Sequence, residues 1–466
     1  MGNMVGRNVN FIYEIETPFG YLPMGYKHTD IPLIFDYINE NDSVSHGGSP
    51  LIYFGYTSST SLFDKLSDGS NIYSSFDIGD GSLNRKLISD INESDIANMI
   101  NVFAITPTHN QTIIQKILSE NIEDYFTKKS KEFLRKYKNF KIVFVDDKEG
   151  GFDYPSSFFD KLNRVKKKLK LTDNQLVFIT NTSNIDSIYN EYIEKHKLKS
   201  FMKCVPLHFY IYDDAGSCII DYFSKSESEK DSVNYDGIDY TIPYEIEMDK
   251  KRDNYYLCMN RNSERMHRTY LVSDLVRNNV FDKGLVSLYQ SDAVDKECRT
   301  NKILKETIGD KYPFVIDYDD KDFVANMHNY FNTKDSWMDS YFSIVNETTV
   351  SNRHIFITEK CVRPMIYFHP FIIYGNPFLL KHLRELGFET FPEFFDESYD
   401  EEIDKVKRRK LIVSNVKRLC DKSLDEIHEM YQSVIPKLIH NRRLLVDMTF
   451  SNKKFNTFLE AIVDED

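Results

Sequence analysis

Two clusters of basic side chains stand at the start of predicted helices in the second half of the chain. Lys360 follows Thr358 and Glu359 in the segment TEKCVRP, and Arg265 and Arg268 lie in the segment MNRNSERMHR. A helix dipole is positive at its start and disfavours cations there. Two such placements without visible compensation therefore favour a bound anion, for which a helix start is a ready site.

A diphosphate is the anion that fits these clusters best. It has enough oxygens to engage an arginine fork and a lysine at the same time. The helix that carries Lys360 begins either after Thr358, as its N-cap, or at Pro364, and both starts leave Lys360 and Arg363 beside its first turn. The competing interpretation is that these cations are solvated or paired with a neighbouring acid such as Glu264 or Glu359.

The composition indicates a globular chain with more than one domain. Its 466 residues predict two domains, or three, at roughly 150 residues each. Hydrophobic residues make up 41% of the chain and aromatic residues 14%, which excludes a disordered chain. The net charge of −13 argues against a generally basic nucleic-acid-binding surface, although it leaves room for a local basic cleft.

Cysteine usage and hydropathy bear on the compartment. The six cysteines are scattered, with no C-x-x-C pair, which predicts reduced thiols in a reducing compartment. No apolar run approaches the roughly 20 residues of a membrane span, and the first residues, MGNMVGRNVNF, lack the apolar core of a signal peptide. We therefore expect a cytoplasmic protein without a membrane span.

The elements that must position the basic clusters alternate between strand and helix. In the first half, short apolar runs predict strands at 9–16, 50–58, 99–107, 140–147 and 175–182. In the second half, strands are expected at 255–260, 284–290, 340–348 and 370–376, and helices at 263–278, after Thr358 and at 377–387. Such alternation predicts an α/β fold with parallel sheets.

Two further segments bear on the organisation of the chain. A charged stretch at 225–252 separates the halves and is expected to be a linker or a loop. The letters SLDE at Ser423–Glu426 form a capping box that should start the last long helix, and Pro436 should kink that helix.

The motifs around both basic clusters resemble those of α1,3-fucosyltransferase-like glycosyltransferases. FSIVNET followed by FITEKCVRPMIYFHPFIIYGN is similar to the family's donor-binding segment, in which a strand with Glu or Asn precedes Y-V-T-E-K and an apolar strand ending in Gly. LCMNRNSERMHRTYLVSDL is similar to its S-N-x-x-x-x-R helix opening, and FMKCVPLHFYIY to its V/M-P-x-x-Y stretch. The patterns TEK..RP and LRELGF.TF also resemble uncharacterised virus-encoded relatives.

The resemblance implies a glycosyltransferase of the GT-B type, with two Rossmann-like domains that face a cleft. It further implies metal-independent, inverting transfer from a nucleotide-diphosphate sugar, with no other cofactor. We expect an acceptor domain at 1–235, a donor domain at 250–445 and a C-terminal tail at 446–466.

Roles for the basic clusters follow from the same resemblance. Lys360 would bind the diphosphate, and Glu359 would hold the ribose hydroxyls, as acidic residues do in nucleotide-binding folds. Arg265, or Arg268 if the register slips, would take the other phosphate oxygens. The remaining donor-binding candidates are Thr358, Asn260 and Glu347.

The resemblance also implies a carboxylate just after the fourth strand of the first domain, which removes a proton from the acceptor hydroxyl. The segment KIVFVDDKEGGFDYP offers Asp146, Asp147 and Glu149 at that place, and we favour Glu149, then Asp147. The competing interpretation is that these acids cap a helix or solvate a loop. His109, in TPTHN, is an outside candidate for an acceptor contact or the base.

Two other interpretations stay open. The acid pairs at Asp146, Asp213 and Asp317 are similar to the D-x-D metal site of the other major glycosyltransferase fold. Basic residues already supply positive charge here, which makes a metal unnecessary. The chain could also be a non-catalytic nucleotide-sugar-binding or virion-associated protein with the same fold.

The acceptor could be a glycan or a hydroxymethylated DNA base. Virus-like relatives support DNA, as do the basic runs RVKKKLK from Arg164 and KVKRRK from Lys405, whereas the acidic net charge opposes it. If the chain is viral, we expect it to act in the host cytoplasm.

Overall fold

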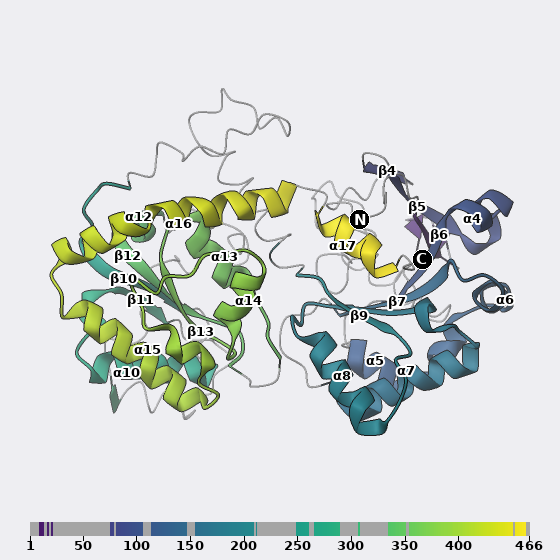
Figure 1. The fold of residues 1–466 in the computed structure, drawn as a ribbon, viewed down its shortest axis with the longest axis horizontal. Helices are drawn as coiled ribbons and strands as arrows, with labels where there is room; N and C mark the ends of the chain where they lie inside the picture. The colour runs from purple at the N-terminus through teal and green to yellow at the C-terminus, as the bar shows by residue number, and fades with distance from the viewer. Residues whose placement is uncertain are drawn as a thin grey trace, which may run out of the picture. The chain divides into compact units, whose positions relative to one another are not determined.

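The computed structural model divides into two compact units, drawn as a ribbon in Figure 1. Unit 1 comprises Met1–Phe209 and Asn452–Asp466, and unit 2 comprises Tyr210–Ser451. The structure describes residues 9–13, 16–17, 20–21, 75–78, 81–105, 113–146, 154–208, 211, 248–260, 265–288, 306–307, 334–350, 354–450 and 453–462. Unit 1 is therefore made from two separate segments of the chain.

Unit 1 is built on a seven-stranded sheet. Its strands are β1 (Val9–Tyr13), β4 (Ser75–Ile78), β5 (Gly81–Leu87), β6 (Ile100–Ile105), β7 (Phe140–Asp146), β8 (Leu176–Thr180) and β9 (Lys203–Pro206). Their order is β4-β5-β1-β6-β7-β8-β9, and all neighbours run parallel except β4 and β5. A separate antiparallel pair consists of β2 (Glu16–Thr17) and β3 (Gly20–Tyr21).

Helices cover this sheet. They are α4 (Glu93–Asn98), α5 (Ile113–Ser119), α6 (Lys128–Lys136), α7 (Ser156–Leu169), α8 (Ile185–His196) and α17 (Lys453–Ile462), with short 3-10 turns at Ile88–Asp90, Ile122–Tyr125 and Asp173–Gln175. In α7, the buried side chains recur three and four residues apart, as at Phe158, Leu162, Val165 and Leu169. This spacing places them on one face, which packs toward the core beside α5 and α8 (Figure 1).

Unit 2 is built on a four-stranded parallel sheet. Its strands are β10 (Asn254–Asn260), β11 (Leu285–Leu288), β12 (Ser340–Asn346) and β13 (Phe371–Tyr374), in the order β11-β10-β12-β13. Its helices are α10 (Met266–Arg277), α12 (Lys334–Met338), α13 (Glu359–Ile366), α14 (Leu379–Glu385), α15 (Lys405–Cys420) and α16 (Leu424–Phe450), with 3-10 turns at Phe281–Lys283 and Glu397–Glu401. In Figure 1, α10 and α15 lie on one face of the sheet and α13 and α16 on the other.

The strand order of unit 2 creates a switch point between β10 and β12. From β10 the chain crosses to β11 on one side, whereas from β12 it crosses to β13 on the opposite side. The connections that leave the carboxyl ends of the two central strands therefore lead to strands on opposite sides of them. In open α/β sheets a switch point of this kind is where ligands bind.

The α/β fold with parallel sheets that we predicted from the sequence is confirmed in both units. Each expected strand within the described residues coincides with an observed one, whereas the expected strand at 50–58 lies outside them. The hairpin of β4 and β5 was not predicted, because the letters SFDI and GSLNRKL mix polar and apolar residues without clear alternation.

The predicted capping box starts the last long helix of unit 2. The backbone N–H of Ser423 donates to a carboxylate oxygen of Glu426 over 2.8 Å, and the N–H of Glu426 donates back to the Ser423 hydroxyl over 3.2 Å. The helix that follows, α16, continues through Pro436 to Phe450. Beyond it, within the segment expected to be a tail, α17 belongs to unit 1, where it contacts β9 and buries Phe458 and Ile462.

Among the described residues, no helix is both long and apolar enough to cross a membrane. The single tryptophan of the chain, Trp337, is buried in unit 2 at 4% exposure and stacks on Tyr367 with ring centroids 4.7 Å apart.

Candidate functional site

A pair of buried amides joins the two strands at the switch point of unit 2. Asn260 ends β10 and Asn346 ends β12, and both side chains are almost completely buried. The Nδ2 of Asn346 donates to the Oδ1 of Asn260 over 2.7 Å. This bond fixes the spacing of the two carboxyl ends. The basic residues of the candidate site follow these two strands in the sequence.

Glu347, the residue after β12, is a buried carboxylate that holds the start of α13. At 1% exposure, it accepts hydrogen bonds from the backbone N–H of Thr348 over 3.0 Å and of Thr358 over 3.2 Å. It also accepts from the Thr358 hydroxyl over 2.7 Å and from the Cys361 thiol over 2.8 Å. Four donors thus satisfy a charge that burial would otherwise penalise heavily.

The Cys361 thiol keeps its proton in this arrangement. Burial raises the pKa of Cys361 well above its ordinary value, and the negative charge of Glu347 raises it further. The thiol is therefore a hydrogen-bond donor to Glu347 and not a nucleophile, since only a thiolate attacks.

Thr358 is the N-cap of α13, which confirms the first of the two helix starts predicted from the sequence. Its hydroxyl oxygen accepts from the backbone N–H of Lys360 over 3.2 Å. Pro364 lies inside the helix, so the start at Pro364 is wrong. Lys360 consequently occupies the first turn, where the helix dipole disfavours a cation.

The charge of Lys360 is compensated within the chain. Its Nζ lies 2.5 Å from a carboxylate oxygen of Glu359 and also donates to the hydroxyls of Thr348 and Thr358 over 3.3 and 3.4 Å. Burial alone would raise the pKa of Glu359, but the charges of Lys360 and Arg363 outweigh it and hold that pKa below its usual value. Both side chains of the pair are about one-fifth exposed, at 22% and 19%, so a ligand can reach them.

Arg265 approaches the same point from the other side of the switch point. It is the N-cap of α10, and its Nη1 donates to the backbone carbonyl of Thr348 over 2.9 Å. Lys360 contacts the hydroxyl of that same residue. Two basic helix starts that are almost a hundred residues apart in the sequence therefore meet at Thr348, beside the carboxyl ends of the central strands.

The structure distinguishes between the two arginines of this cluster. Arg268 is only 4% exposed and lies one turn further into α10, where its charge influences the pKa of Cys258 and of His267. Arg265 is partly exposed at the start of α10. The geometry therefore favours Arg265 for a ligand contact and places Arg268 beneath it.

His267 belongs to this site although no sequence motif selects it. Its Nε2 lies 2.9 Å from the backbone carbonyl of Glu347, which can only accept, so the ring donates there. Burial lowers the pKa of His267 from 6.5 to about 4, and the charges of Arg268 and Arg265 act in the same direction. The imidazole is neutral at pH 7 and adds no charge between the two arginines.

The lowered pKa of His267 predicts a loss of stability in acid. The unfolded chain takes up a proton near pH 6.5 and the folded chain only near pH 4, so stability is full above pH 6.5 and falls as the pH drops toward 4. The shift corresponds to about 3 kcal/mol of unfolding free energy at pH 4. We expect His267→Gln, which can still donate to the carbonyl, to lack this component. Urea unfolding at pH 7 and pH 4 measures it. An equal pH dependence in both proteins would contradict the assignment.

A second unpredicted residue is Gly375, the residue after β13. A Cβ added there would lie 3.2 Å from the Cβ and Cγ of Glu347 and 3.0 Å from a methyl group of Leu379. A larger residue at this position would have to push Glu347 or Leu379 aside by a few tenths of an ångström, so glycine suits the close approach of β13 to the buried carboxylate. The sequence pattern showed the glycine but not what it accommodates.

The first-unit acids are described only in part. Asp146 ends β7 and is 3% exposed, and its carboxylate accepts from the Tyr154 hydroxyl over 2.6 Å. The other two catalytic candidates, Asp147 and Glu149, lie outside the described residues.

Other sequence candidates also fall outside the described residues. They are His109, Asp213, Glu264 and Asp317. Among the residues that the structure does describe, no group of three or more His, Cys, Asp or Glu side chains is placed to hold a metal ion.

The comparisons with known proteins give little. No family model matches the chain, and no curated protein matches its sequence. Among solved structures, the chain is similar to a mutant of S. aureus TarM in complex with Fondaparinux, alpha-GlcNAc-glycerol and UDP, with 9% identity and a TM-score of 0.34. The likeness covers 71% of this chain and 52% of that chain, so this chain spans about half the length of the matched one. A likeness this distant carries no argument about function.

Proposed function

We propose that the chain is a glycosyltransferase of the GT-B type that takes its sugar from a nucleotide-diphosphate sugar bound to unit 2. The observation that carries the proposal is the meeting of Arg265 and Lys360 at Thr348, on the switch point of a parallel sheet. A switch point is where such sheets bind ligands, and paired cations from two helix starts match the two phosphates of a diphosphate.

Binding would redistribute the contacts of the Lys360–Glu359 pair. Lys360 would turn from Glu359 to a phosphate oxygen, and the freed carboxylate would accept from the ribose hydroxyls, while Arg265 takes the other phosphate. Thr358, Glu347 and Asn260 would keep the helix start and the strand ends in place. Preorganised cations of this kind stabilise the charge that develops on a departing nucleoside diphosphate, without a metal.

The proposal assigns the acceptor to unit 1 and an inverting mechanism to the reaction. A carboxylate after β7, Glu149 or Asp147, would remove the proton of the acceptor hydroxyl while the sugar is transferred in one displacement. The acceptor is a glycan or a hydroxymethylated DNA base. In GT-B enzymes two Rossmann-like domains face a cleft, and closure excludes water from the diphosphate.

A thermal-shift panel tests the donor site. UDP, GDP, UDP-sugars and GDP-sugars are added to the wild type and to Lys360→Ala, with and without Mn²⁺. A nucleotide at about 100 times its dissociation constant should stabilise the wild type by ~2.7 kcal/mol. We expect a metal-independent shift that is lost in Lys360→Ala.

Lys422→Ala is a matched control for this experiment. Lys422 also pairs with a glutamate, Glu426, over 3.3 Å. It lies near the amino end of β10, on the side of the sheet away from the candidate site. Tyr255, at the beginning of β10, donates to the Lys422 carbonyl over 2.5 Å. The control should keep the full shift. No shift with any nucleotide would refute the proposal, and a shift that requires Mn²⁺ would refute its metal-independent form.

A further inference from the structure

Helix α6 of unit 1 carries Lys128 and Lys131 in its first turn, and within the described residues neither has an ion pair like that of Lys360. Its letters, KKSKEFLRK, contain five basic residues and one acid, and no acid lies in its first turn. Thr127 is the N-cap and accepts from the N–H of Ser130 over 3.3 Å. The dipole of α6 therefore adds to the positive potential of its own side chains.

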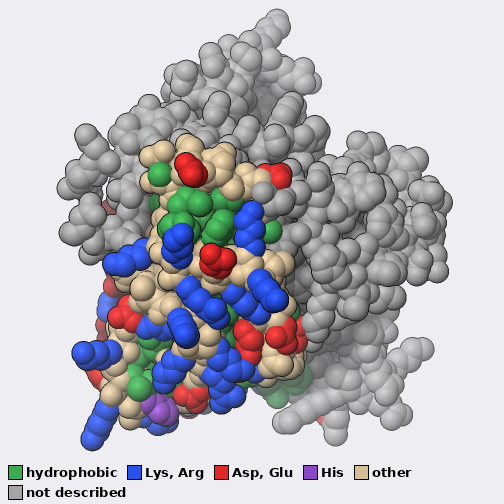
Figure 2. All heavy atoms as spheres, turned by 90° about the vertical axis from the view of Figure 1, so that its right-hand side faces the viewer, with side chains coloured by type: hydrophobic (Ala, Val, Ile, Leu, Met, Phe, Trp, Pro, Cys, Tyr) green, Lys and Arg blue, Asp and Glu red, His purple; other side chains and the backbone are tan. Residues whose placement is uncertain are grey.

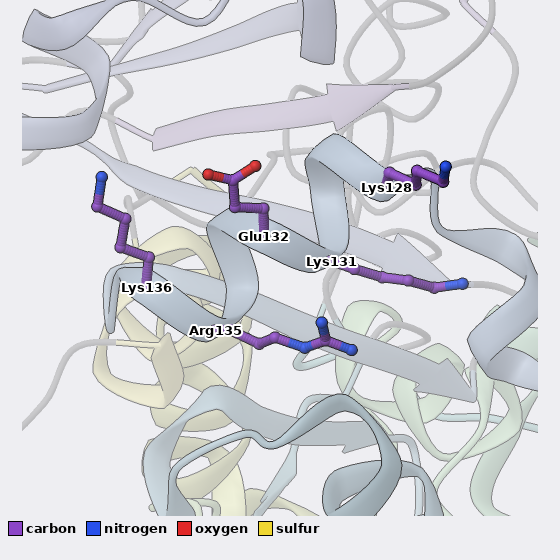
Figure 3. A pocket seen from close by; sticks show the side chains of 5 residues that line it. All are labelled: Lys128, Lys131, Glu132, Arg135 and Lys136. Carbon is purple, nitrogen blue, oxygen red and sulfur yellow. The ribbon is translucent and has the colours of Figure 1, made fainter.

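The cations of α6 are available at the surface. Figure 3 shows Lys128, Lys131 and Arg135 pointing to one side of the helix and Glu132 and Lys136 to the other. Within the described part of the chain, no ion pair engages Lys128, Lys131 or Arg135. These five side chains line an open hollow of about 470 Å³.

Neighbouring elements extend this positive face. Figure 2 shows Lys and Arg side chains gathered over unit 1 on the side where α6 lies in Figure 1. Helix α7 contacts α6 and adds the exposed side chains of Arg164 and Lys167. Two other cations of α7 are neutralised, since Lys166 pairs with Asp173 and Lys168 with Glu123.

The apolar side chains of α6 face inward or lie beneath cations. Leu134 is completely buried, which leaves the helix no apolar anchor to insert into a lipid surface. Phe133 and Tyr137 are half-buried and lie under the ammonium groups of Lys129 and Lys136, at 5.5 and 5.1 Å. The helix therefore presents no bare ring on which unpaired bases could stack.

We propose that the α6 face, defined by Lys128, Lys131 and Arg135 with Arg164 and Lys167 of α7, docks the phosphodiester backbone of double-stranded nucleic acid. Cations on a helix that itself presents no bare aromatic ring match a backbone that is read by charge alone. The net charge of −13 on the whole chain makes this face a local exception and not part of a generally basic surface. The docking surface belongs to unit 1 and does not depend on the donor site of unit 2.

The basic run KVKRRK from Lys405 is less suited to binding a duplex. Arg408 is 1% exposed and donates to backbone carbonyls, among them that of Val350 over 3.2 Å. Arg409 pairs with Asp274 over 2.7 Å. Two of the five basic side chains of this run thus have partners within the chain, whereas its three lysines are exposed. Helix α15 therefore supplies a control.

Fluorescence anisotropy with a labelled 20-base-pair duplex tests the proposal across a range of salt concentrations. The wild type should bind, and K128Q/K131Q/R135Q should bind at least about tenfold more weakly, with the slope of log K against log salt reduced by ~2.7. The control K407Q/K410Q/K417Q on α15 removes the same charge from exposed positions and should bind within about threefold of the wild type. The charge-retaining K128R/K131R should also bind like the wild type.

Parallel probes separate the alternatives. A scrambled duplex should bind equally well, whereas the corresponding single strand and vesicles of anionic lipid should bind more weakly. Equal losses in the α6 variant and the α15 control would overturn the proposal, as would binding that ignores salt. Tighter binding of the single strand or of the vesicles would overturn the assignment to a duplex. Circular dichroism confirms that each variant is folded.

Discussion

Replacing Glu347 with alanine should lower the free energy of unfolding of unit 2 by about 3–5 kcal/mol. The change removes the acceptor for four donors, from Thr348, Thr358 and Cys361, and leaves these groups buried without a partner. Trp337 is the single tryptophan of the chain and is buried in unit 2. Urea unfolding followed by its fluorescence therefore reports on this unit alone.

The isosteric variant Glu347→Gln should recover only part of the loss. One carboxylate oxygen accepts from the Thr358 N–H and the other from the Thr348 N–H. Whichever oxygen becomes an NH₂ group, it faces a donor. Glu385→Ala is the control, because Glu385 is 51% exposed in its pair with Lys381 and should change stability by less than about 1 kcal/mol. A loss below 1 kcal/mol in Glu347→Ala would show that the four contacts do not stabilise the site.

Replacing both Glu149 and Asp147 with alanine should reduce transfer by about 10²–10⁴-fold and leave donor binding intact. The loss is expected because the acceptor hydroxyl then has no base, whereas the phosphates are held by residues of unit 2. The measurement is the release of nucleoside diphosphate, in the presence of candidate acceptors, from the nucleotide sugar that shifts the melting temperature. The melting shift itself shows that the donor still binds.

Asp146→Asn is the control for this second prediction. The Asp146 carboxylate is buried and engaged by Tyr154 over 2.6 Å, and an asparagine oxygen can accept the same hydrogen bond. We expect transfer to stay within about tenfold of the wild type. Full activity in the double variant would show that neither Glu149 nor Asp147 is the base. A wild type that binds a nucleotide sugar but transfers nothing would support a non-catalytic binding protein.

The sequence was sufficient to predict most strands of the two sheets, the helices that carry the basic clusters and the strand ends at which these clusters meet. Parallel α/β alternation places all strand ends that precede helices on one edge, so Arg265 and Lys360 had to approach one another. The capping chemistry of Thr358 and of Ser423 was equally local. Such features depend on residues that are close in the chain.

The environment of each side chain was not predictable in the same way. Glu347 was selected as a donor-binding residue, but its burial depends on Gly375, from another strand. The pairing of Lys360 with Glu359 is the arrangement that the competing interpretation of the basic clusters expected, but the sequence alone did not favour it over a bound anion. His267 carries no motif, and the exposure of α6 becomes visible only once Leu134 is placed in the core.

The position of α17 in unit 1 has a consequence for the synthesis of the protein. The chain leaves unit 1 at Phe209 and returns at Asn452, and only then supplies the helix that buries Phe458 and Ile462. Because domains fold as the chain emerges from the ribosome, the part of unit 1 that is made first must wait, with apolar surface uncovered, until all of unit 2 has been translated. A stop codon or a protease cut just after α16 would therefore damage unit 1, although most of that unit precedes unit 2 in the sequence.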